Sequence, residues 1–346
     1  MKKVLITGVA GMIGSHLLDF LIERRYEIIG TDNLSFGKLE NIESNMEKEN
    51  FKFCRVDITD AETLKILAKD MDIIIHLAAV KKIGELDSSM ATLKINVQGT
   101  ENVLEAARIW GCKVVFASTS DVYGMSPDLP FREDGYLLLG PSMIKHWSSA
   151  VSKLHCEQLA FAYFKDYSVP IVVLRYFGGF SPRSSFSWSG GHIPIFVDAI
   201  LNDQDVPIHG NGKQTRSMAY VDDLVEGTIL AMENENAVGE VINLGNDEEI
   251  SVIDTAYLIH KIANTGNELK LKYIPMKEIF GKYKDIMRRV PDLTKAYSLL
   301  GYKPKIDMKE AIRRIIGLRR NAILKDTQIP KPSSVDYQED VSATAP

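Results

Sequence analysis

The chain has 346 residues, of which 45% are apolar and 25% are charged, with a formal net charge of −5. This length suits one large α/β domain with a second, smaller lobe, and the acidic balance without a basic block excludes a nucleic-acid-binding surface. No apolar run approaches the roughly 20 residues that span a bilayer, so we expect no membrane partner. The three cysteines (Cys54, Cys112 and Cys156) show no CxxC spacing. They predict buried reduced thiols and a cytoplasmic location.

The first half of the sequence alternates apolar strands with helical patterns. Strands are predicted at 4–7, 28–31, 51–56, 73–77 and 114–117, and helices at 12–23, 61–69 and 91–109. This alternation predicts a parallel sheet with helices on both faces. Right-handed crossovers make it a doubly wound (Rossmann) α/β fold, which binds ligands at the carboxyl ends of its strands.

The second half becomes irregular from about Arg175 and is rich in Gly, Ser and Pro through 178–194. It then predicts a strand at 241–244 and helices at 252–263 and 309–318. We expect a first domain at 1–175, to which segments of 212–245 return, and a smaller α/β substrate-binding lobe at 176–324. Residues 325–346 are polar and Pro-rich, which predicts a disordered tail.

A glycine-rich loop follows the first strand and opens the first helix. Its glycines are Gly8, Gly11 and Gly14, with Met12 and Ile13 in the same turn. Glycine permits a tight turn and a close approach of the backbone to a pyrophosphate, which the helix N-terminus then binds. The alternative is that these glycines form an ordinary turn with no role in binding.

Asp32 ends the second strand, about 20 residues further on, where a ribose-binding carboxylate is expected. Asn33 and Leu34 follow it, and neither is an arginine that could bind a 2′-phosphate. The loop and the acid together therefore predict NAD as the cofactor, in preference to NADP.

The G-x-x-G-x-x-G spacing resembles the short-chain dehydrogenase/reductase superfamily, and further segments resemble its extended, nucleotide-sugar branch. These segments are Asp57-Ile58, His76-Leu77-Ala78-Ala79, Asn96-Val97-Gln98-Gly99-Thr100, Ser118 to Gly124, Gln214-Thr215-Arg216 and Arg288 to Asp292. The resemblance extends to about residue 320. It implies that Asp57 and Ile58 contact the adenine, and that Leu77, Ala78, Ala79 and Lys153 lie on the nicotinamide side.

The sequence is most similar to the UDP-glucuronic acid decarboxylase group. The shared run is Thr119 to Met125, Gly140-Pro141, Trp147 and Ala150 to Lys153. In that group the equivalents of Thr119, Ser120, the acid at 121 and Arg289 surround the sugar, although the acid is normally glutamate and here is Asp121. Arg216, and more weakly Arg183, resemble groups that bind a diphosphate or a sugar carboxylate.

This similarity implies a UDP-sugar substrate that is oxidised at C4 and then decarboxylated. UDP-sugar 4-epimerase and 4,6-dehydratase activities remain alternatives. One departure weakens the expected orientation of the substrate: the branch usually has asparagine at the position of Gly178.

A second departure concerns the base. The family's tyrosine stands four residues before the lysine, and here that position is Ser149, while Lys153 is present. Loss of a positioned base costs about 10²–10⁴-fold in rate. We interpret Ser149 as an engineered inactivating substitution. The alternatives are a natural base recruited from Asp121, Tyr123 or a water, and a non-catalytic protein that binds NAD and a nucleotide sugar.

Two expectations concern other partners. The seven histidines show no metal-ligand spacing, so we expect no metal. Helices at 91–109 and 148–165 carry apolar faces that resemble the four-helix dimer interface of this branch, so a homodimer is expected.

Overall fold

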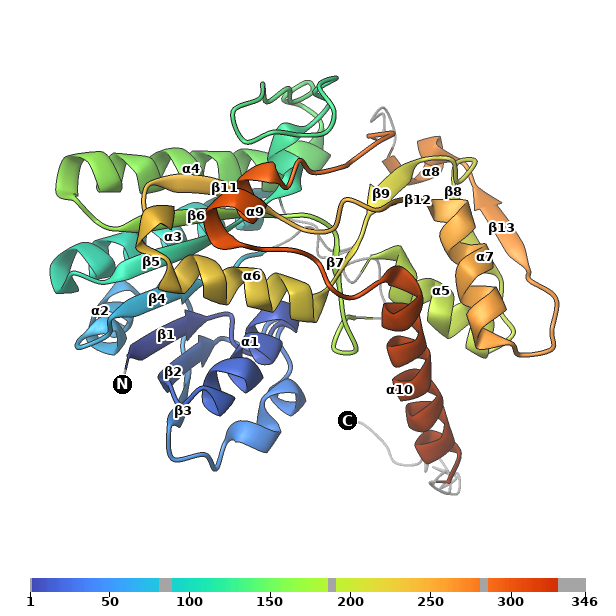
Figure 1. The fold of residues 1–346 in the computed structure, drawn as a ribbon, viewed down its shortest axis with the longest axis horizontal. Coiled ribbons are helices and arrows are strands. Elements are labelled where there is room, and N and C mark those ends of the chain that lie inside the picture. Colours follow the sequence, from blue (N-terminus) through green and yellow to red (C-terminus); the bar gives the residue numbers. More distant parts are fainter. Residues whose placement is uncertain (1, 81–88, 186–190, 281–285, 329–346) are drawn as a thin grey trace, which may run out of the picture.

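The computed structural model describes residues 2–80, 89–185, 191–280 and 286–328. Within these ranges the main body is a seven-stranded parallel sheet in the order β11-β6-β5-β4-β1-β2-β3 (Figure 1). Its strands are β1 (Lys3–Thr7), β2 (Glu27–Asp32), β3 (Phe51–Arg55), β4 (Ile73–His76), β5 (Lys113–Thr119), β6 (Ile171–Tyr176) and β11 (Glu240–Leu244). The predicted doubly wound α/β fold is confirmed.

The strand order reverses at β1, which lies between β2 and β4. In the register of these pairs Thr7 is opposite both Thr31 and His76, so three strand ends meet at one level. A ligand of a doubly wound sheet binds outside the carboxyl ends of the strands at such a reversal. The fold therefore directs attention to the loops after β1, β2 and β4.

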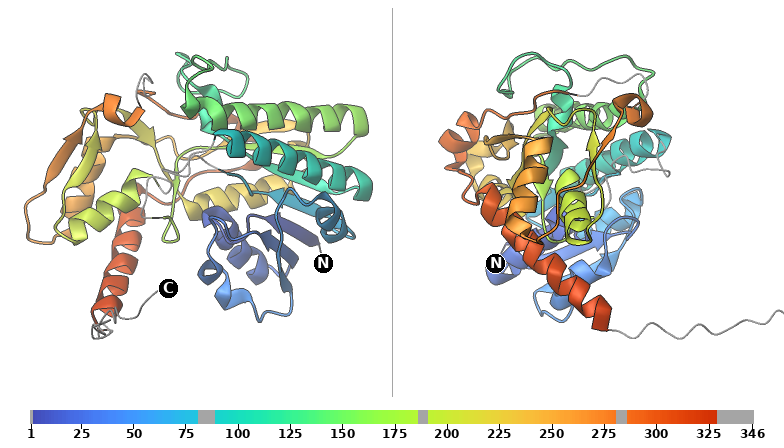
Figure 2. Two further views of the ribbon diagram at one scale, coloured as in Figure 1. Left: turned by 180° about the vertical axis from the view of Figure 1, so that it is seen from behind. Right: turned by 90° about the vertical axis from the view of Figure 1, so that its right-hand side faces the viewer.

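Side chains alternate between the two faces of the sheet, as a strand requires. On β1, Val4 and Ile6 belong to one hydrophobic core, and Leu5 belongs to the other. Helices α1 (Met12–Glu23) and α6 (Val221–Glu233) pack together against the first core. Helices α2 (Ala61–Ala68), α3 (Ser89–Trp110) and α4 (Ser148–Tyr167) cover the second, with α3 and α4 side by side (Figure 2).

A smaller lobe lies beside this body (Figure 1). It contains short strand pairs, parallel β8–β13 and antiparallel β9–β12, packed with helices. Its elements are α5 (His192–Leu201), β8 (Val206–His209), β9 (Thr215–Ser217), β12 (Glu249–Ser251), α7 (Val252–Ala263), β13 (Leu271–Ile274), α8 (Met276–Phe280) and α10 (Met308–Gln328). The parallel pair β7 (Gly179–Phe180) and β10 (Ala219–Tyr220) and helix α9 (Thr294–Leu300) complete the chain.

The structure differs from the sequence prediction at several elements. Strand β6 was not predicted, because its buried apolar run lacks the alternation of a one-sided strand. Helix α5 begins inside the segment expected to be irregular, and its Pro194 stands in the first turn, where proline is tolerated. Helix α10 continues to Gln328, into the segment expected to be a disordered tail.

The rest of that tail lies outside the described residues. Strand β11 lies in the main sheet next to β6, within the segment expected to return there. The division of the chain into domains stays a prediction.

Candidate active site

The loop between β1 and α1 packs tightly against the end of β4. Gly8 has a φ of +76°, and a Cβ there would lie 2.7 Å from the backbone nitrogen of Ala78. A Cβ on Gly14 would lie 2.2 Å from the carbonyl oxygen of Gly8. Both positions therefore require glycine. The N-cap of α1 is Gly11, which supplies no capping side chain, so the N–H groups of Met12 and Ile13 are suited to bind phosphate oxygens.

Asp32 lies beside this loop at the end of β2. Its carboxylate accepts hydrogen bonds from the backbone N–H groups of Ala10 at 3.1 Å and Leu34 at 2.8 Å. Burial raises the pKa of Asp32, and these two donors oppose that rise. The fixed carboxylate can accept from ribose hydroxyls and would repel a 2′-phosphate.

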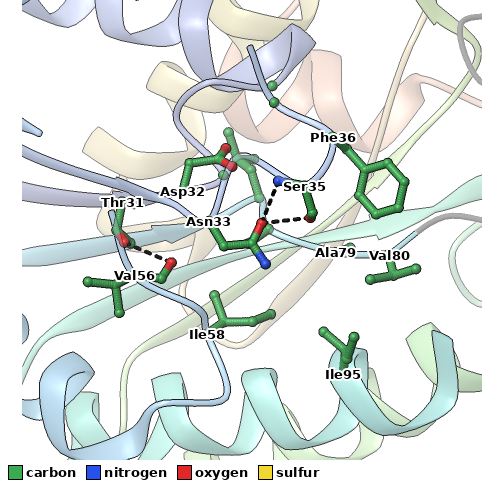
Figure 3. Close-up of a pocket in the computed structure, with 15 residues that line it drawn as sticks. Thr31, Asp32, Asn33, Ser35, Phe36, Val56, Ile58, Ala79, Val80 and Ile95 are labelled. Carbon is green, nitrogen blue, oxygen red and sulfur yellow. Dashed lines mark hydrogen bonds between the residues drawn. The ribbon is translucent and has the colours of Figure 1, made fainter. Parts of the chain in front are cut away.

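A cavity of about 120 Å³ opens next to Asp32 (Figure 3). Its walls are mostly apolar, and Ile58 and Ile95 face it from one side. Its full lining is Gly8, Gly11, Thr31, Asp32, Asn33, Ser35, Phe36, Gly37, Val56, Ile58, Leu77, Ala78, Ala79, Val80 and Ile95. Apolar walls next to a ribose-binding acid fit an adenosine. The glycine loop and this cavity together fit a dinucleotide.

Asp57 is not part of that lining but supports it. Its carboxylate accepts from Asn33 Nδ2 at 2.7 Å and from the backbone N–H of Thr59 at 2.9 Å. Asn33 Oδ1 in turn accepts from the backbone N–H of Ser35 at 2.9 Å. Asp57 thus fixes the loop beside the cavity, whereas Ile58 faces the cavity directly, and the adenine contact of both residues stays a prediction.

His76 ties the end of β4 to its neighbours. Its Nδ1 lies 2.7 Å from Thr7 Oγ1, and its Nε2 lies 3.1 Å from Thr100 Oγ1 on α3. The side chain is fully buried, and burial followed by the charge of Lys153 lowers its pKa to about 3. Thr7 also accepts from the backbone N–H of Ala78 at 3.3 Å. A neutral histidine thus fixes the strand end that carries the predicted nicotinamide-side residues.

Lys153 lies on α4 and contacts β5 near its carboxyl end. Its Nζ donates to the carbonyl oxygen of Ala117 at 2.6 Å and lies 4.7 Å from the centre of the Phe116 ring. Burial lowers its pKa to about 8. Ala117 stands two residues before Thr119, so the ammonium group lies next to the predicted sugar-binding strand end.

Ser149 stands one helical turn before Lys153, in a well-held first turn of α4. Its carbonyl oxygen accepts from Ser152 Oγ at 2.8 Å, and Ser152 Oγ accepts from Asn96 Nδ2 at 3.0 Å. Asn96 also bonds both backbone groups of Val80, at 2.7 and 3.1 Å. The helix turn is thereby fixed to the cofactor cavity, although its side chain at 149 is too short for the family's base.

The predicted sugar-side residues begin where β5 ends. Thr119 Oγ1 accepts from the backbone N–H of Asp121 at 3.2 Å, and Ser120 is buried in the 3-10 helix η4 (Ser120–Tyr123) that follows. The carboxylate of Asp121 forms an ion pair with Nη1 of Arg289. Their side chains are 22% and 17% exposed, so the pair is partly withdrawn from solvent. The structure therefore brings together Thr119, Ser120, Asp121 and Arg289, whose equivalents surround the sugar in the group that the sequence resembles.

The other two predicted arginines differ in their surroundings. Arg216 Nη1 donates to the carbonyl oxygen of Ile286 at 2.8 Å, which keeps it near the segment that carries Arg289. Arg183 instead forms an ion pair with Asp19 of α1 at 2.8 Å. This contact holds Arg183 against the cofactor-side helix, and its role toward a substrate stays a prediction.

Tyr123, one of the alternative bases, is committed to packing. Its ring is 1% exposed and stacks on Phe131, with centroids 4.7 Å apart. Its hydroxyl donates to Asn243 Oδ1 at 2.7 Å, and burial raises its pKa to about 12. A phenol held in this way is a poor proton acceptor at neutral pH.

The surroundings of Gly178 account for one departure from the family pattern, the lack of asparagine at this position. Its φ is +25°, and a Cβ there would lie 2.7 Å from both Met218 Sδ and the carbonyl oxygen of Ser217. The backbone path after β6 therefore excludes the asparagine that the branch usually has at this position.

Sequence reasoning missed part of the site. The cavity residues Ser35, Phe36, Gly37, Val80 and Ile95 were not predicted. Phe36 is 46% exposed, and an aromatic residue in the loop directly after the acid was a usable signal. Within the described ranges, no cluster of His, Cys, Asp and Glu could hold a metal ion. No helix in those same ranges is long and apolar enough to cross a membrane.

Comparison with protein families identifies one match over most of the chain. The family model described as GDP-mannose 4,6 dehydratase matches residues 5–315. A UDP-N-acetyl-alpha-D-glucosaminuronate decarboxylase from Bacillus cytotoxicus is 34% identical over 91% of this chain and 97% of the relative. UDP-glucuronic acid decarboxylase 1 of Xenopus tropicalis is 32% identical over 96% of this chain and 76% of the relative.

Solved structures give the same picture. The UDP-glucuronic acid 4-epimerase from Bacillus cereus, in complex with UDP-glucuronic acid and NAD, is 30% identical with a TM-score of 0.82. The alignment covers 92% of this chain and 99% of that one. The UDP-glucose 4-epimerase from Thermotoga maritima, with UDP-glucose, is 29% identical with a TM-score of 0.82, over 93% and 99% of the two chains.

Proposed function

The chain belongs to the GDP-mannose 4,6 dehydratase family of extended short-chain dehydrogenases/reductases, which act on nucleotide sugars. From that premise we propose that it binds NAD and a UDP-linked uronic acid, and that this site is built to oxidise C4 of the sugar and release its carboxylate as CO2. Two of its relatives are decarboxylases of such sugars by name.

One observation carries the choice of substrate. The acid at 121 and Arg289 form an ion pair directly after the strand end that carries Thr119. A carboxylate and a guanidinium at this point can distinguish a charged C5 substituent from a hydroxymethyl group, because a second carboxylate would compete with Asp121 for Arg289. A 4-epimerase of a sugar with a hydroxymethyl group at C5 needs no such pair, so the pair favours a uronic acid as substrate, and the similarity to decarboxylases favours the loss of CO2.

The residues support this chemistry as follows. Bound NAD supplies an acceptor for the hydride that leaves C4. The hydroxyl of Thr119 would hydrogen-bond the C4 oxygen, which becomes a ketone once a base has taken the hydroxyl proton and the hydride has left C4; in the family that base is the tyrosine whose position Ser149 occupies. The C6 carboxylate is then β to a ketone, so the C5–C6 bond can break, CO2 departs, and the electron pair moves to the C4 oxygen as an enolate. Protonation of C5 by water then gives the 4-keto pentose. The Lys153 ammonium, largely protonated at pH 7 with its pKa of about 8, would stabilise that negative oxygen.

Ser149 stands where the family has its tyrosine base. We propose that it disables proton removal from the C4 hydroxyl while leaving both binding sites intact. The bonds from Asn96 and Ser152 support the second part of this proposal, because they hold the first turn of α4 against Val80 of the cofactor cavity with serine at position 149. Tyr123 is a poor substitute, since its hydroxyl is already bonded to Asn243.

The deciding experiment is product analysis by NMR for the Ser149→Tyr variant. The substrates are UDP-glucuronic acid, UDP-N-acetylglucosaminuronic acid, UDP-glucose and UDP-N-acetylglucosamine, with NAD added. We expect CO2 loss from uronic acids only, at about 10²–10⁴ times the rate of the unaltered chain. Ser148→Tyr, which adds the same ring one position earlier on α4, is the matched control and should gain nothing.

The other outcomes would change the assignment. A C4 epimer with all carbons retained would make this an epimerase, as the Bacillus cereus and Thermotoga maritima structures are by name. An unaltered chain that already decarboxylates at the rate of the tyrosine variant would mean that another base works. Binding of NAD and nucleotide sugar without turnover in either chain would favour a binding protein.

We also propose that the protein is a homodimer in the cytoplasm. Helices α3 and α4 lie side by side, and each exposes apolar side chains. These are Met90, Ile109 and Trp110 on α3, and Val151, Phe164 and Tyr167 on α4. Three free cysteines, two of them buried, support the proposed cytoplasmic location, because thiols stay reduced in that compartment. Sedimentation equilibrium tests the dimer, and a monomer mass at micromolar concentration would contradict it.

A further inference from the structure

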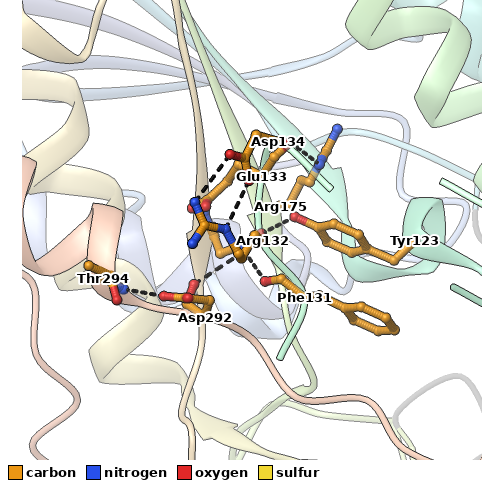
Figure 4. Close-up of polar contacts among 9 residues, drawn as sticks. Tyr123, Phe131, Arg132, Glu133, Asp134, Arg175, Asp292 and Thr294 are labelled. Atoms are coloured by element: carbon orange, nitrogen blue, oxygen red, sulfur yellow. Dashed lines mark hydrogen bonds and ion pairs between the residues drawn. The ribbon is translucent and has the colours of Figure 1, made fainter. Parts of the chain in front are cut away.

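Asn243, at the end of β11, joins three distant parts of the chain. Its side chain is fully buried, and its Oδ1 accepts from the Tyr123 hydroxyl at 2.7 Å. Its Nδ2 donates to the carbonyl oxygens of Phe131 at 2.9 Å and Asp292 at 3.3 Å. Figure 4 shows Tyr123, Phe131 and Asp292 gathered in this network. Every polar atom of the amide is therefore used, so the three segments are fixed relative to one another.

The segment around Asp292 is the one that carries Arg289. It is tied to Phe131 by two backbone bonds, from Phe131 N–H to the Val290 oxygen at 2.8 Å and from Asp292 N–H to the Phe131 oxygen at 2.9 Å. On its other side, the N–H of Ser217 in β9 donates to the Arg289 oxygen at 3.3 Å. The backbone at 289–292 is thus held on both sides.

The side chains along this segment alternate. Arg288 and Val290 line a second hollow of about 600 Å³ on one side, while Arg289 between them contacts Asp121. Its guanidinium therefore faces the sugar-side strand end, and the backbone of the segment decides how far it reaches.

The tyrosine end of the network is equally fixed. The Arg175 guanidinium lies 4.8 Å from the centre of the Tyr123 ring. Arg175 is itself held by a buried two-point contact with Glu157, at 2.7 and 3.0 Å. The carboxylate of Glu157 also accepts from Ser118, the residue before Thr119. The ring cannot shift without disturbing charges buried beneath the catalytic strand end.

Together these contacts form a closed network. Asp121 and Tyr123 belong to the same 3-10 turn, and both are tied to 289–292, one through the Arg289 side chain and the other through Asn243. We propose that Tyr123 and Asn243 are positioning residues. They hold the backbone at 289–292 so that the Arg289 guanidinium stays at the sugar-side strand end, within reach of a sugar carboxylate that competes with Asp121 for it. This inference rests on the proposed function, because it concerns the same pair.

The test measures binding by calorimetry in the full chain with NAD present, using UDP-glucuronic acid and UDP as probes. Tyr123→Phe removes only the hydroxyl, and we expect UDP-glucuronic acid to bind about tenfold more weakly while UDP binds within twofold of the unaltered chain. Asn243→Asp keeps the acceptor for Tyr123 but loses both donors, and should act in the same direction.

Two controls separate positioning from general damage. Tyr302→Phe removes another buried tyrosine hydroxyl, which donates to the Gly245 oxygen at 2.7 Å, and should not change the affinity ratio of the two probes. In an Arg289→Gln background, Tyr123→Phe should have no further effect, because the group that it positions is gone.

The outcomes are distinct. Equal loss for UDP and UDP-glucuronic acid, an additive effect in the Arg289→Gln background, or no effect of Tyr123→Phe would overturn the positioning role and leave the proposed function standing. An unaltered chain that binds UDP-glucuronic acid no better than UDP would overturn the proposed function and this inference with it.

Discussion

The cofactor side and the sugar side of the candidate active site are built in different ways. On the cofactor side, the glycine loop, Asp32 and the end of β4 all come from the first 80 residues and meet because three parallel strands end at one level. On the sugar side, the pair of Asp121 and Arg289 joins residues 168 positions apart. The first depends on the local path of the backbone, and the second on long side chains held by distant segments.

This difference explains where the chain departs from its family. The departures at Asp121, Ser149 and Gly178 fall on the sugar side, while the glycine loop is complete. An alanine at Gly14 would meet backbone atoms of Gly8 and Val9 in the loop after β1, whereas a serine at 149 changes only a side chain. Substitutions on the two sides should therefore separate cofactor binding from sugar binding.

Among the substitutions that test this comparison, the largest effect on binding is expected at Gly14. In Gly14→Ala the new Cβ would lie 2.2 Å from the Gly8 oxygen, so the phosphate-binding loop must move. We expect NAD to bind roughly 10- to 100-fold more weakly, which corresponds to the usual 1–3 kcal/mol cost of overpacking. UDP affinity should change little. Fluorescence titration with NADH and calorimetry with UDP measure the two separately.

Gly317→Ala is the matched control, since it is also a helical glycine but has no atom within 4 Å of the new Cβ. It should keep its NAD affinity and raise the free energy of unfolding by about 0.5–1 kcal/mol. If Gly14→Ala weakened UDP as much as NAD, the two sides would not be separable and the comparison would be wrong.

The sequence also predicts the cofactor side of the site better than the sugar side. The glycine spacing and Asp32 placed the cofactor loop, because both are local patterns whose geometry is nearly independent of the rest of the chain. Strand β6 escaped prediction because a run buried on both faces has no alternation, and its Arg175 looks like a loop residue until Glu157 is placed beside it. The role of Asn243 had no local signal at all, since its partners lie 49 to 120 residues away.

A smaller effect on binding is expected at Asp121, and it tests the sugar side of the site alone. Asp121→Asn removes the charge that neutralises Arg289, so the guanidinium becomes available to a substrate carboxylate. We expect UDP-glucuronic acid to bind about tenfold more tightly, as a charge-assisted hydrogen bond allows. UDP-glucose and NAD should bind as before, and calorimetry with the three ligands checks this. Equal tightening of UDP-glucose would mean that Asp121 does not lie near the C5 substituent.

The smallest effect at neutral pH is on the free energy of unfolding, and it concerns His76 at the end of β4. The buried ring of His76 has a pKa lowered from 6.5 to about 3 by burial and then by Lys153. Below pH 6.5 the unfolded chain binds a proton at this position that the folded chain refuses until about pH 3. The free energy of unfolding should therefore fall through that window, by up to about 1.4 kcal/mol per pH unit for this residue alone.

Urea denaturation at pH 7, 6 and 5 measures this slope. His76→Gln should be less stable than the unaltered chain at pH 7, because its bonds to Thr7 and Thr100 are disturbed, yet its stability should fall less steeply toward pH 5. His16 and His192, whose pKa values burial lowers to about 4 and about 3, would retain part of the slope in that variant. If the variant and the unaltered chain lost stability in parallel, His76 would not be the neutral link between β1, β4 and α3 that its geometry indicates. The integrity of the cofactor side at low pH would then depend on other groups.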